Sequence, residues 1–264
     1  MIDTHPHLYS EEFDQDRQEA VSRAFANEVS QIFLPAIDSE THQKMLDLEA
    51  AYPQKIFAMM GLHPCSVKPD TWEKELEIVE KYLNQRDFCA VGEIGIDLYW
   101  EQSTLDIQTK AFEKQIDWAV ERELPIVIHT RNSFDETFEV LERKKHPRLC
   151  GIFHCFSGDK AQALRAIEMG FYLGIGGVVT VYLKNDTREA ANGVIKNMKL
   201  VKMASSLGGV ESLVNHCYSQ SHSGVPHDVK MEMGIKVGLL RFSVGIEDVD
   251  DIWNDISKAL DTTL

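Results

Sequence analysis

The sequence predicts an α/β protein with a TIM-like (β/α) barrel, and three observations carry this prediction. Short apolar runs alternate with amphipathic helical stretches up to about residue 180, a pattern typical of parallel strands joined by crossover helices. The 264 residues suit a barrel of this kind, although two average domains would also fit. Metal-ligand residue types recur where the predicted strands end. A doubly wound open sheet is the main alternative.

Seven strand-helix units are expected before residue 180. The apolar runs predict strands at 2–4, 31–34, 56–60, 88–93, 125–129, 149–154 and 171–175. The amphipathic stretches between them predict helices at 10–25, 40–52, 71–84, 105–123, 135–145 and 160–169. Seven such steps in one direction make up most of an eightfold barrel.

The N-terminal stretch M-I-D-T-H-P-H-L places two histidines at the first predicted strand. Side chains alternate between the faces of an extended strand, so His5 and His7 point the same way, with Asp3 on that face too. Two adjacent imidazoles at a strand end make half of a metal site. A single histidine near a terminus is more simply a solvated polar residue, so partners on other strands decide between these interpretations.

Metal-ligand residues do recur at the ends of later predicted strands. F-C-A-V-G-E ends in Glu93, P-I-V-I-H in His129 and C-G-I-F-H in His154, while A-M-M-G-L-H runs into His63. Parallel barrel strands place their C-terminal ends on one rim, so these residues are expected to meet the N-terminal pair there. Each residue alone has an ordinary explanation, such as a histidine at a loop start. Their recurrence in four strands indicates a shared metal site.

The residue types suit a hydrolytic centre with one or two divalent ions. Neutral imidazoles hold borderline ions such as zinc, and a carboxylate can bridge two ions about 4 Å apart. Magnesium and manganese are the other expected ions. Such a centre lowers the pKa of a water molecule and neutralises a phosphate in line for attack. Gly92 and Gly95, on either side of Glu93, are expected to let the backbone turn sharply at the rim.

Residues just beyond the strand ends are candidates for substrate binding. Arg131 is expected to face an anionic substrate, with a surface ion pair as the alternative. Ser157 and Gly158 are candidate hydroxyl and amide donors to a phosphate, with a helix N-cap as the alternative. Asp97 either orients a ligating histidine or is an exposed loop acid.

Composition indicates a soluble protein of the cytoplasm. Hydrophobic residues make up 44% and charged residues 26%, and no apolar run approaches the roughly 20 residues of a membrane span. The N-terminus lacks the basic residues and apolar core of a signal peptide. Five cysteines without C-x-x-C spacing are expected to be reduced thiols. The net charge of −15 argues against non-specific adhesion to nucleic acid, but bound cations can supply the positive potential that a nuclease needs.

Six segments together resemble those of TatD-type metal-dependent deoxyribonucleases, a branch of the amidohydrolase-like barrels. They lie in order over about residues 1–180 and read D-T-H-P-H-L, G-L-H-P, V-G-E-I-G-I-D, I-V-I-H-T-R, I-F-H-C-F-S-G and Y-L-G-I-G-G. The resemblance implies that the metal ligands are His5, His7, Glu93, His129 and His154. It also implies that Glu93 bridges the ions and that His63 lines the catalytic pocket. The implied reaction is metal-assisted hydrolysis of a DNA phosphodiester, from a single-stranded end.

The resemblance does not extend to the C-terminal part. The family's eighth strand ends in an Asp within a Glu-Thr-Asp-Ser-Pro segment, which this chain lacks. Instead, M-K-L-V-K-M-A-S-S-L-G-G-V-E-S-L and G-L-L-R-F-S-V-G-I-E-D-V-D-D-I-W resemble the C-terminal domain of cystathionine synthases and lyases, over about residues 177–260. Those enzymes use pyridoxal phosphate (PLP), and their counterpart of Arg241 grips the substrate carboxylate. The domain that holds their cofactor is absent, so no PLP is expected, and Arg241 is expected to be an unpartnered surface or interface residue.

We therefore expect a TatD-like barrel at 1–180 and a segment of different origin at 181–264, joined near 176–181 as a natural or engineered chimera. In one arrangement a helix at 187–197 and a makeshift eighth strand at 199–204 complete the barrel, with Ser205 and Ser206 where the family has its Asp. A hydroxyl is a poor replacement for that carboxylate, so one ion would bind more weakly. In the other arrangement seven barrel strands stand beside a small domain built from 239–245 and a helix at 249–260.

Three functions are compatible with these features. The first is a TatD-like hydrolase acting on DNA or another phosphoester, active or impaired by the missing Asp. The second is a chimeric fold with a residual metal site and little activity, which the missing Asp favours. The third is a PLP-dependent cystathionine synthase or lyase fragment, which requires residues that the chain lacks.

Overall fold

The chain divides into two units, Met1–Gly174 and Ile175–Leu264. The computed structural model describes residues 2–174, 176–204, 212–245 and 247–263. Within these ranges no helix is both long enough and apolar enough to cross a lipid bilayer. All five cysteines are described and are free thiols, as expected.

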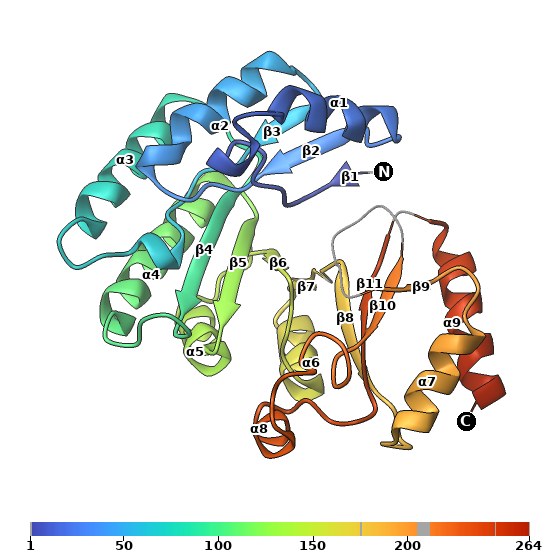
Figure 1. Ribbon diagram of the computed structural model, residues 1–264. Helices are drawn as coiled ribbons and strands as arrows, with labels where there is room; N and C mark the ends of the chain where they lie inside the picture. The colour runs from blue at the N-terminus through green and yellow to red at the C-terminus, as the bar shows by residue number, and fades with distance from the viewer. Residues whose placement is uncertain (1, 175, 205–211, 246, 264) are drawn as a thin grey trace. The chain divides into compact units, whose positions relative to one another are not determined.

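Seven parallel strands form the sheets of the first unit, in the order in which they occur along the chain (Figure 1). One sheet contains β1 (Ile2–Asp3), β2 (Gln31–Leu34) and β3 (Ile56–Ala58). The other contains β4 (Val91–Asp97), β5 (Ile126–Arg131), β6 (Gly151–Phe153) and β7 (Tyr172–Leu173). A parallel bridge between Met60 and Val91 links β3 to β4, so the two sheets follow one another as neighbours.

Helices connect these strands, as crossover connections require. They are η1 (Glu11–Phe13), α1 (Arg17–Ala26), α2 (Ser39–Ala51), η2 (Pro64–Ser66), α3 (Trp72–Gln85), α4 (Leu105–Arg122), α5 (Phe134–Arg143) and α6 (Lys160–Glu168). Two of them begin with capping boxes, which satisfy the first free backbone N–H groups: Asp38 with Thr41 at α2, and Asp159 with Gln162 at α6. The α-helices begin and end within a few residues of the predicted bounds. The exception is the first predicted helix, which is interrupted between η1 and α1.

The core of the first unit lies around β4. All seven residues of β4 are buried, as expected of a parallel strand covered on both faces. The largest fully buried side chains around it include Phe112 of α4, Phe138 of α5 and Phe153 of β6. This packing holds the strands that carry the candidate metal ligands in a fixed arrangement.

Two strands of the site, β4 and β5, extend further along the chain than the sequence predicted. The prediction ended a strand at Glu93, but β4 runs four residues further to Asp97, and β5 passes His129 to end at Arg131. The ladder continues through Gly95 opposite His129 and Asp97 opposite Arg131. The predicted strands ended at Glu93 and His129 because these polar residues break the apolar pattern. A carboxylate that has imidazole partners can nevertheless lie inside a buried strand. Glu93 therefore occupies the third position of β4.

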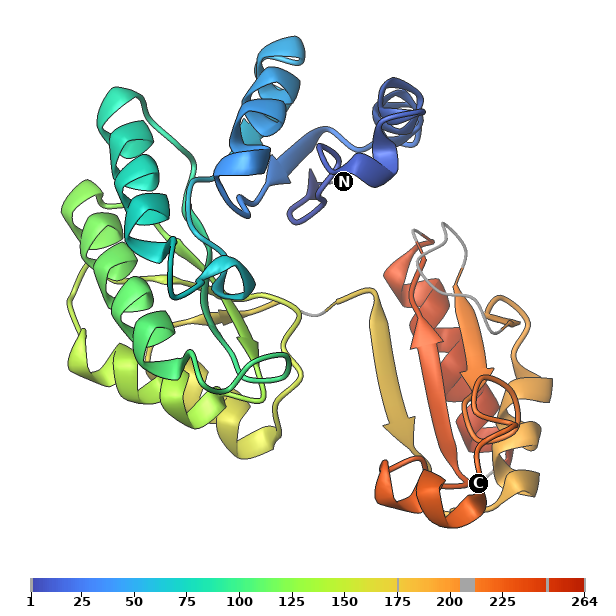
Figure 2. The same ribbon diagram turned by 60° about the vertical axis from the view of Figure 1, so that its left-hand side comes forward.

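The second unit contains a separate four-stranded sheet with its own core. Its strands are ordered β8 (Val178–Tyr182), β11 (Leu239–Ser243), β10 (Leu213–His216) and β9 (Lys202–Met203), with β11 antiparallel to both neighbours and β9 parallel to β10. Helices α7 (Arg188–Asn197) and α9 (Val249–Thr263) cover one face of this sheet (Figure 2), and α8 (His227–Glu232) precedes β11. Apolar residues of both helices pack with Val214, Leu240 and Phe242 of the sheet.

The makeshift eighth strand predicted at 199–204 is wrong. Its described core, β9, pairs with β10 of the second unit, whereas β1 pairs with β2. β9 pairs in parallel with β10, and β10 also packs into the core of the second unit, so the backbone hydrogen bonds of β9 are made within that unit. Ser205 and Ser206 lie outside the described residues. Arg241 is half-buried on β11 and has an interaction partner, so the expectation that it is unpartnered is also wrong.

A single carboxylate attaches the segment before β9 to helix α9. Asp255 accepts hydrogen bonds from the backbone N–H groups of Lys199 at 2.8 Å, Leu200 at 2.9 Å and Val201 at 3.0 Å. Burial alone would raise the pKa of Asp255, but these donors outweigh it and hold the pKa below its usual value.

We expect Asp255→Ala to destabilise the protein by about 1–3 kcal/mol at pH 7, because it leaves these N–H groups without their acceptor. The folded-state pKa lies below the unfolded one, so this stabilisation is present above the unfolded pKa and is lost as the pH falls through the folded pKa. Urea unfolding should therefore give a smaller difference below about pH 4 than at pH 7. Asp261→Ala, an exposed acid on the same helix, is the control, and equal effects of the two substitutions at pH 7 would contradict this role.

Candidate metal centre

One buried carboxylate, that of Glu93, lies at the centre of the predicted site residues. Its exposed fraction is 2%. Oε2 lies 2.9 Å from Nε2 of His5, and Oε1 lies 3.0 Å from Nδ1 of His129. Nε2 of His63 and Nε2 of His7 lie 3.8 and 3.9 Å from Oε2. Residues separated by up to 124 positions in the sequence therefore meet around one side chain, because the parallel strands that precede or carry them all run in the same direction.

Two glycines allow β4 to approach β5 closely on either side of Glu93. A Cβ on Gly92 would lie 2.7 Å from Cβ of Val127, and one on Gly95 would lie 2.0 Å from the carbonyl oxygen of His129. Gly95 also has a φ of +143°, which other residues rarely adopt. The ladder skips Glu93 between Gly92 and Ile94, an irregularity of the bulge type. These glycines thus allow β4 to pack closely against β5. The prediction that they form a sharp turn at the rim is wrong, because both lie inside β4.

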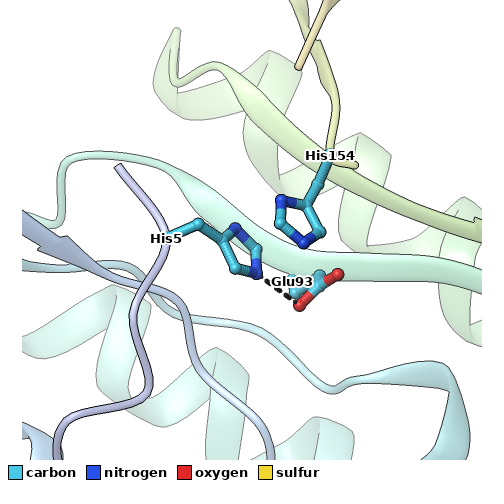
Figure 3. A group of neighbouring side chains, drawn as sticks. All are labelled: His5, Glu93 and His154. Atoms are coloured by element: carbon cyan, nitrogen blue, oxygen red, sulfur yellow. Dashed lines mark hydrogen bonds and ion pairs between the residues drawn. The ribbon is translucent and has the colours of Figure 1, made fainter. Parts of the chain in front are cut away.

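Glu93 belongs to two candidate ligand groups in the part of the chain that the structure describes. His5, Glu93 and His154 form one group, and His63, Glu93 and His129 form the other, each with its potential ligand atoms within 4.8 Å of one another. Figure 3 shows the first group, with the imidazoles of His5 and His154 beside the carboxylate. These two rings stack with their centroids 3.3 Å apart and their planes 10° apart. A shared carboxylate between two sets of imidazoles is the arrangement that a bridging ligand requires.

Two carboxylates bracket the imidazole of His129. Nδ1 faces Glu93, and Nε2 lies 2.8 Å from Oδ2 of Asp97, which is itself buried. Burial would lower the pKa of His129, but hydrogen bonds and charge from Glu93 and Asp97 outweigh it and raise the pKa. Conversely, burial would raise the pKa of Glu93, and His129 and His5 hold it well below its usual value. Asp97 therefore orients a candidate ligand and is not an exposed loop acid.

A hydrogen-bond chain assigns the tautomer of His7. The hydroxyl of Tyr9 donates to the carbonyl oxygen of Pro35, which can only accept. The Tyr9 oxygen therefore accepts from Nδ1–H of His7 at 2.9 Å. Burial lowers the pKa of His7, so the ring is neutral and its Nε2 carries a lone pair on the side of Glu93. The sequence analysis missed Tyr9, which lies in the turn after His7 and whose contact depends on the distant Pro35.

His63 has the opposite tautomer. Its Nδ1 accepts the backbone N–H of Cys65 at 3.1 Å, at the start of η2. Burial lowers the pKa of His63 to about 4, so the ring is neutral and Nε2 bears the hydrogen. His63 thus presents an N–H donor toward Glu93. This tautomer favours a polar contact over a metal bond, although the 3.8 Å between Nε2 and Oε2 of Glu93 would allow either. Burial also lowers the pKa of His154 to about 4, which keeps that imidazole neutral.

The two predicted substrate contacts are exposed, one at the end of β5 and the other in the loop after β6. Arg131 is the last residue of β5, and its guanidinium carbon lies 3.6 Å from the ring centroid of Tyr99. Ser157 is exposed in the loop between β6 and α6, where Asp159 is the N-cap, so a capping role for Ser157 is wrong. The sequence analysis did not single out Tyr99 and Trp100 beside Arg131, although both follow directly after β4.

Comparisons with known proteins agree with this arrangement. The profile of the family described as TatD related DNase matches residues 2–203. An uncharacterized metal-dependent hydrolase of Bacillus subtilis, YabD, is 33% identical over 202 residues, which are 76% of this chain and 78% of that protein. The 3'-5' ssDNA/RNA exonuclease TatD of Salmonella typhimurium is 31% identical over 179 residues, 68% of each chain.

A solved structure is similar as well. The crystal structure of the TatD homologue YjjV from Escherichia coli K12 superimposes with a TM-score of 0.60 and 32% identity, and covers 67% of this chain and 68% of that one. The matched fold is the TIM-barrel-like α/β fold of amidohydrolases. The matched range of the family profile includes the strands that carry Glu93 and the surrounding histidines. The chain therefore belongs to the TatD related DNase family of metal-dependent hydrolases.

Proposed function

We propose that this chain hydrolyses phosphodiester bonds of DNA with divalent metal ions, working from a single-stranded end. The observation that carries the proposal is the position of Glu93 between two sets of imidazoles, since one carboxylate shared in this way can hold two ions. Family membership supplies the class, metal-dependent hydrolase. The Salmonella relative, whose name describes an exonuclease on single-stranded DNA and RNA, supports nucleic acid as the substrate.

The donors around Glu93 fit a divalent cation. Imidazole nitrogens suit zinc, and the carboxylate oxygens of Glu93 also suit manganese and magnesium. We propose that the ions are held by His5, His7, Glu93, His129 and His154. Three observations support this set: the lone pair on Nε2 of His7, the neutral ring of His154, and the carboxylate of Asp97 that fixes Nε2 of His129. His129 would hold a cation with its neutral ring, and Asp97 would orient that ring through the hydrogen bond at Nε2.

Each of the remaining residues has a role of its own. A bound divalent cation would supply Lewis acidity, which lowers the pKa of an attacking water and offsets phosphate charge. Nε2–H of His63 is placed to donate a hydrogen bond to a phosphate oxygen near Glu93, so His63 and Glu93 form the catalytic pair that we propose. Arg131 and Ser157 are proposed phosphate contacts, because Arg131 is exposed at the end of β5, which carries His129, and Ser157 is exposed three residues after His154. They supply positive charge and a hydroxyl in a protein of net charge −15.

We also propose that the second unit has a different origin from the first, as its resemblance to the C-terminal domain of cystathionine-type enzymes implies. Its mixed sheet supports this proposal, because a family barrel would continue with a parallel strand after β7. The consequence is a second candidate function, a chimeric fold that retains the metal site with little turnover. The missing Glu-Thr-Asp-Ser-Pro segment favours it, since one cation would lose a carboxylate ligand.

Replacement of Glu93 tests the proposed function directly. We expect Glu93→Ala to lose bound metal by elemental analysis, because it removes the only carboxylate common to both groups among the described residues. Release of nucleotides from a single-stranded oligonucleotide with Mg²⁺ or Mn²⁺ should fall at least about 100-fold. Glu139→Ala, an exposed acid on α5, should retain both properties. Metal binding without nucleotide release by the unaltered protein would favour the chimeric-fold alternative.

Replacement of Tyr9 tests the hydrogen-bond chain that assigns the tautomer of His7. We expect Tyr9→Phe to weaken Zn²⁺ or Mn²⁺ binding about 10- to 100-fold in calorimetric titration, because Nδ1–H of His7 loses the acceptor that orients its ring. Tyr82→Phe is the matched control, as this ring packs against His42, away from Glu93. Unchanged metal affinity in the folded Tyr9→Phe variant would show that Tyr9 does not position a ligand.

A further inference from the structure

An aromatic cluster lies at the same end of β4 and β5 as the candidate metal ligands. Tyr99 and Trp100 follow β4, and Arg131 ends β5. The Arg131 guanidinium carbon lies 3.6 Å from the centroid of Tyr99 and 5.5 Å from that of Trp100. The two rings are perpendicular, with centroids 4.8 Å apart. The exposed fractions are 50% for Tyr99 and 71% for Trp100, so large aromatic surfaces remain open to solvent.

One buried carboxylate fixes both this cluster and a candidate metal ligand. Oδ1 of Asp97 accepts the backbone N–H of Tyr99 at 2.9 Å and, at 3.4 Å, that of Trp100. Oδ2 of the same carboxylate contacts Nε2 of His129. The backbone N–H of Leu98 donates to the carbonyl oxygen of Arg131, and the side-chain amide of Gln108 bonds to both backbone groups of Asp97, so the start of this loop is held. The exposed rings are therefore attached to a backbone that the Asp97 side chain, the Gln108 side chain and the β4–β5 ladder hold beside His129.

We infer that Tyr99, Trp100 and Arg131 form a stacking subsite for an unpaired nucleobase beside the metal centre. The inference rests on the proposed function for its choice of nucleic acid as ligand. Single exposed aromatic residues are common on protein surfaces and need no explanation. Here two adjacent rings and a guanidinium lie beside the candidate metal centre, where we propose that phosphodiesters are hydrolysed. Aromatic rings together with arginine are the groups that bind single strands without reading their sequence.

The chemistry of the cluster assigns a role to each member. The Trp100 ring is the most exposed and offers a flat face to a base. Arg131 stacks on Tyr99, which orients its positive charge toward solvent beside the centre, where an adjacent phosphate would lie. Stacking requires a base that is free of its own duplex neighbours, so the subsite selects frayed or single-stranded ends over paired ones.

Binding of the full-length protein in EDTA separates stacking from hydrolysis. The probes are a ten-nucleotide oligo-dT and the same strand with abasic tetrahydrofuran residues at its last two 3' positions. We expect Trp100→Ala to weaken oligo-dT binding about 5- to 150-fold, the effect of removing one base–aromatic stack, and Trp100→Phe to retain most of the affinity. Trp253→Ala, which removes a ring of 66% exposure on α9, should change nothing.

The abasic strand distinguishes a base contact from a phosphate contact. It should bind the unaltered protein more weakly than oligo-dT, and Trp100→Ala should not weaken it further. Equal losses on both strands, or no loss on oligo-dT in a Trp100→Ala protein with unchanged circular dichroism, would overturn the subsite.

Activity with Mn²⁺ separates this inference from the proposed function. A raised KM with little change in kcat in Trp100→Ala supports the subsite, and unchanged KM with continued nucleotide release overturns it while the proposed function stands. Stacking-dependent binding without any nucleotide release by the unaltered protein supports the subsite and overturns the proposed function.

Discussion

The buried carboxylate of Glu93 is the constraint on which the first unit depends. An ionised carboxylate withdrawn from water costs several kcal/mol unless charged or hydrogen-bonding groups compensate it. Here the compensation comes from imidazoles on β5, which pairs with β4 in a fixed register, and on the segment after β1, so both segments must converge on Glu93 for its charge to be tolerated. The same requirement accounts for Gly92 and Gly95, which permit the close approach of β4 to β5.

The sequence predicted the parts of this arrangement that depend on periodicity. Strand and helix order in the first unit follows from apolar runs and amphipathic stretches, and β2 has the predicted bounds of 31–34. The convergence of Glu93 with the histidines also follows from sequence, because parallel strands align their ends. The lengths of β4 and β5 do not follow, since the polar residues that interrupt the apolar pattern lie inside these strands and not after them.

Other features depend on contacts between distant segments and could not be predicted from local pattern. The role of Tyr9 depends on the carbonyl group of Pro35, and that of Asp97 depends on the position of His129 one strand away. Likewise, the segment at 199–204 has the composition of a strand, but its partner is decided by competition between sheets. β10 and the core of the second unit provide that partner, so local propensity alone could not assign β9.

The placement of the donors along the chain bears on how such a protein can arise. Every proposed ligand occurs before residue 155, whereas the second unit begins at Ile175. Recombination downstream of His154 can therefore exchange an entire C-terminal unit and keep these five donors, with the loss of only the family's eighth-strand Asp. Selection on these five donors and selection on the C-terminal unit can thus act on separate stretches of one gene.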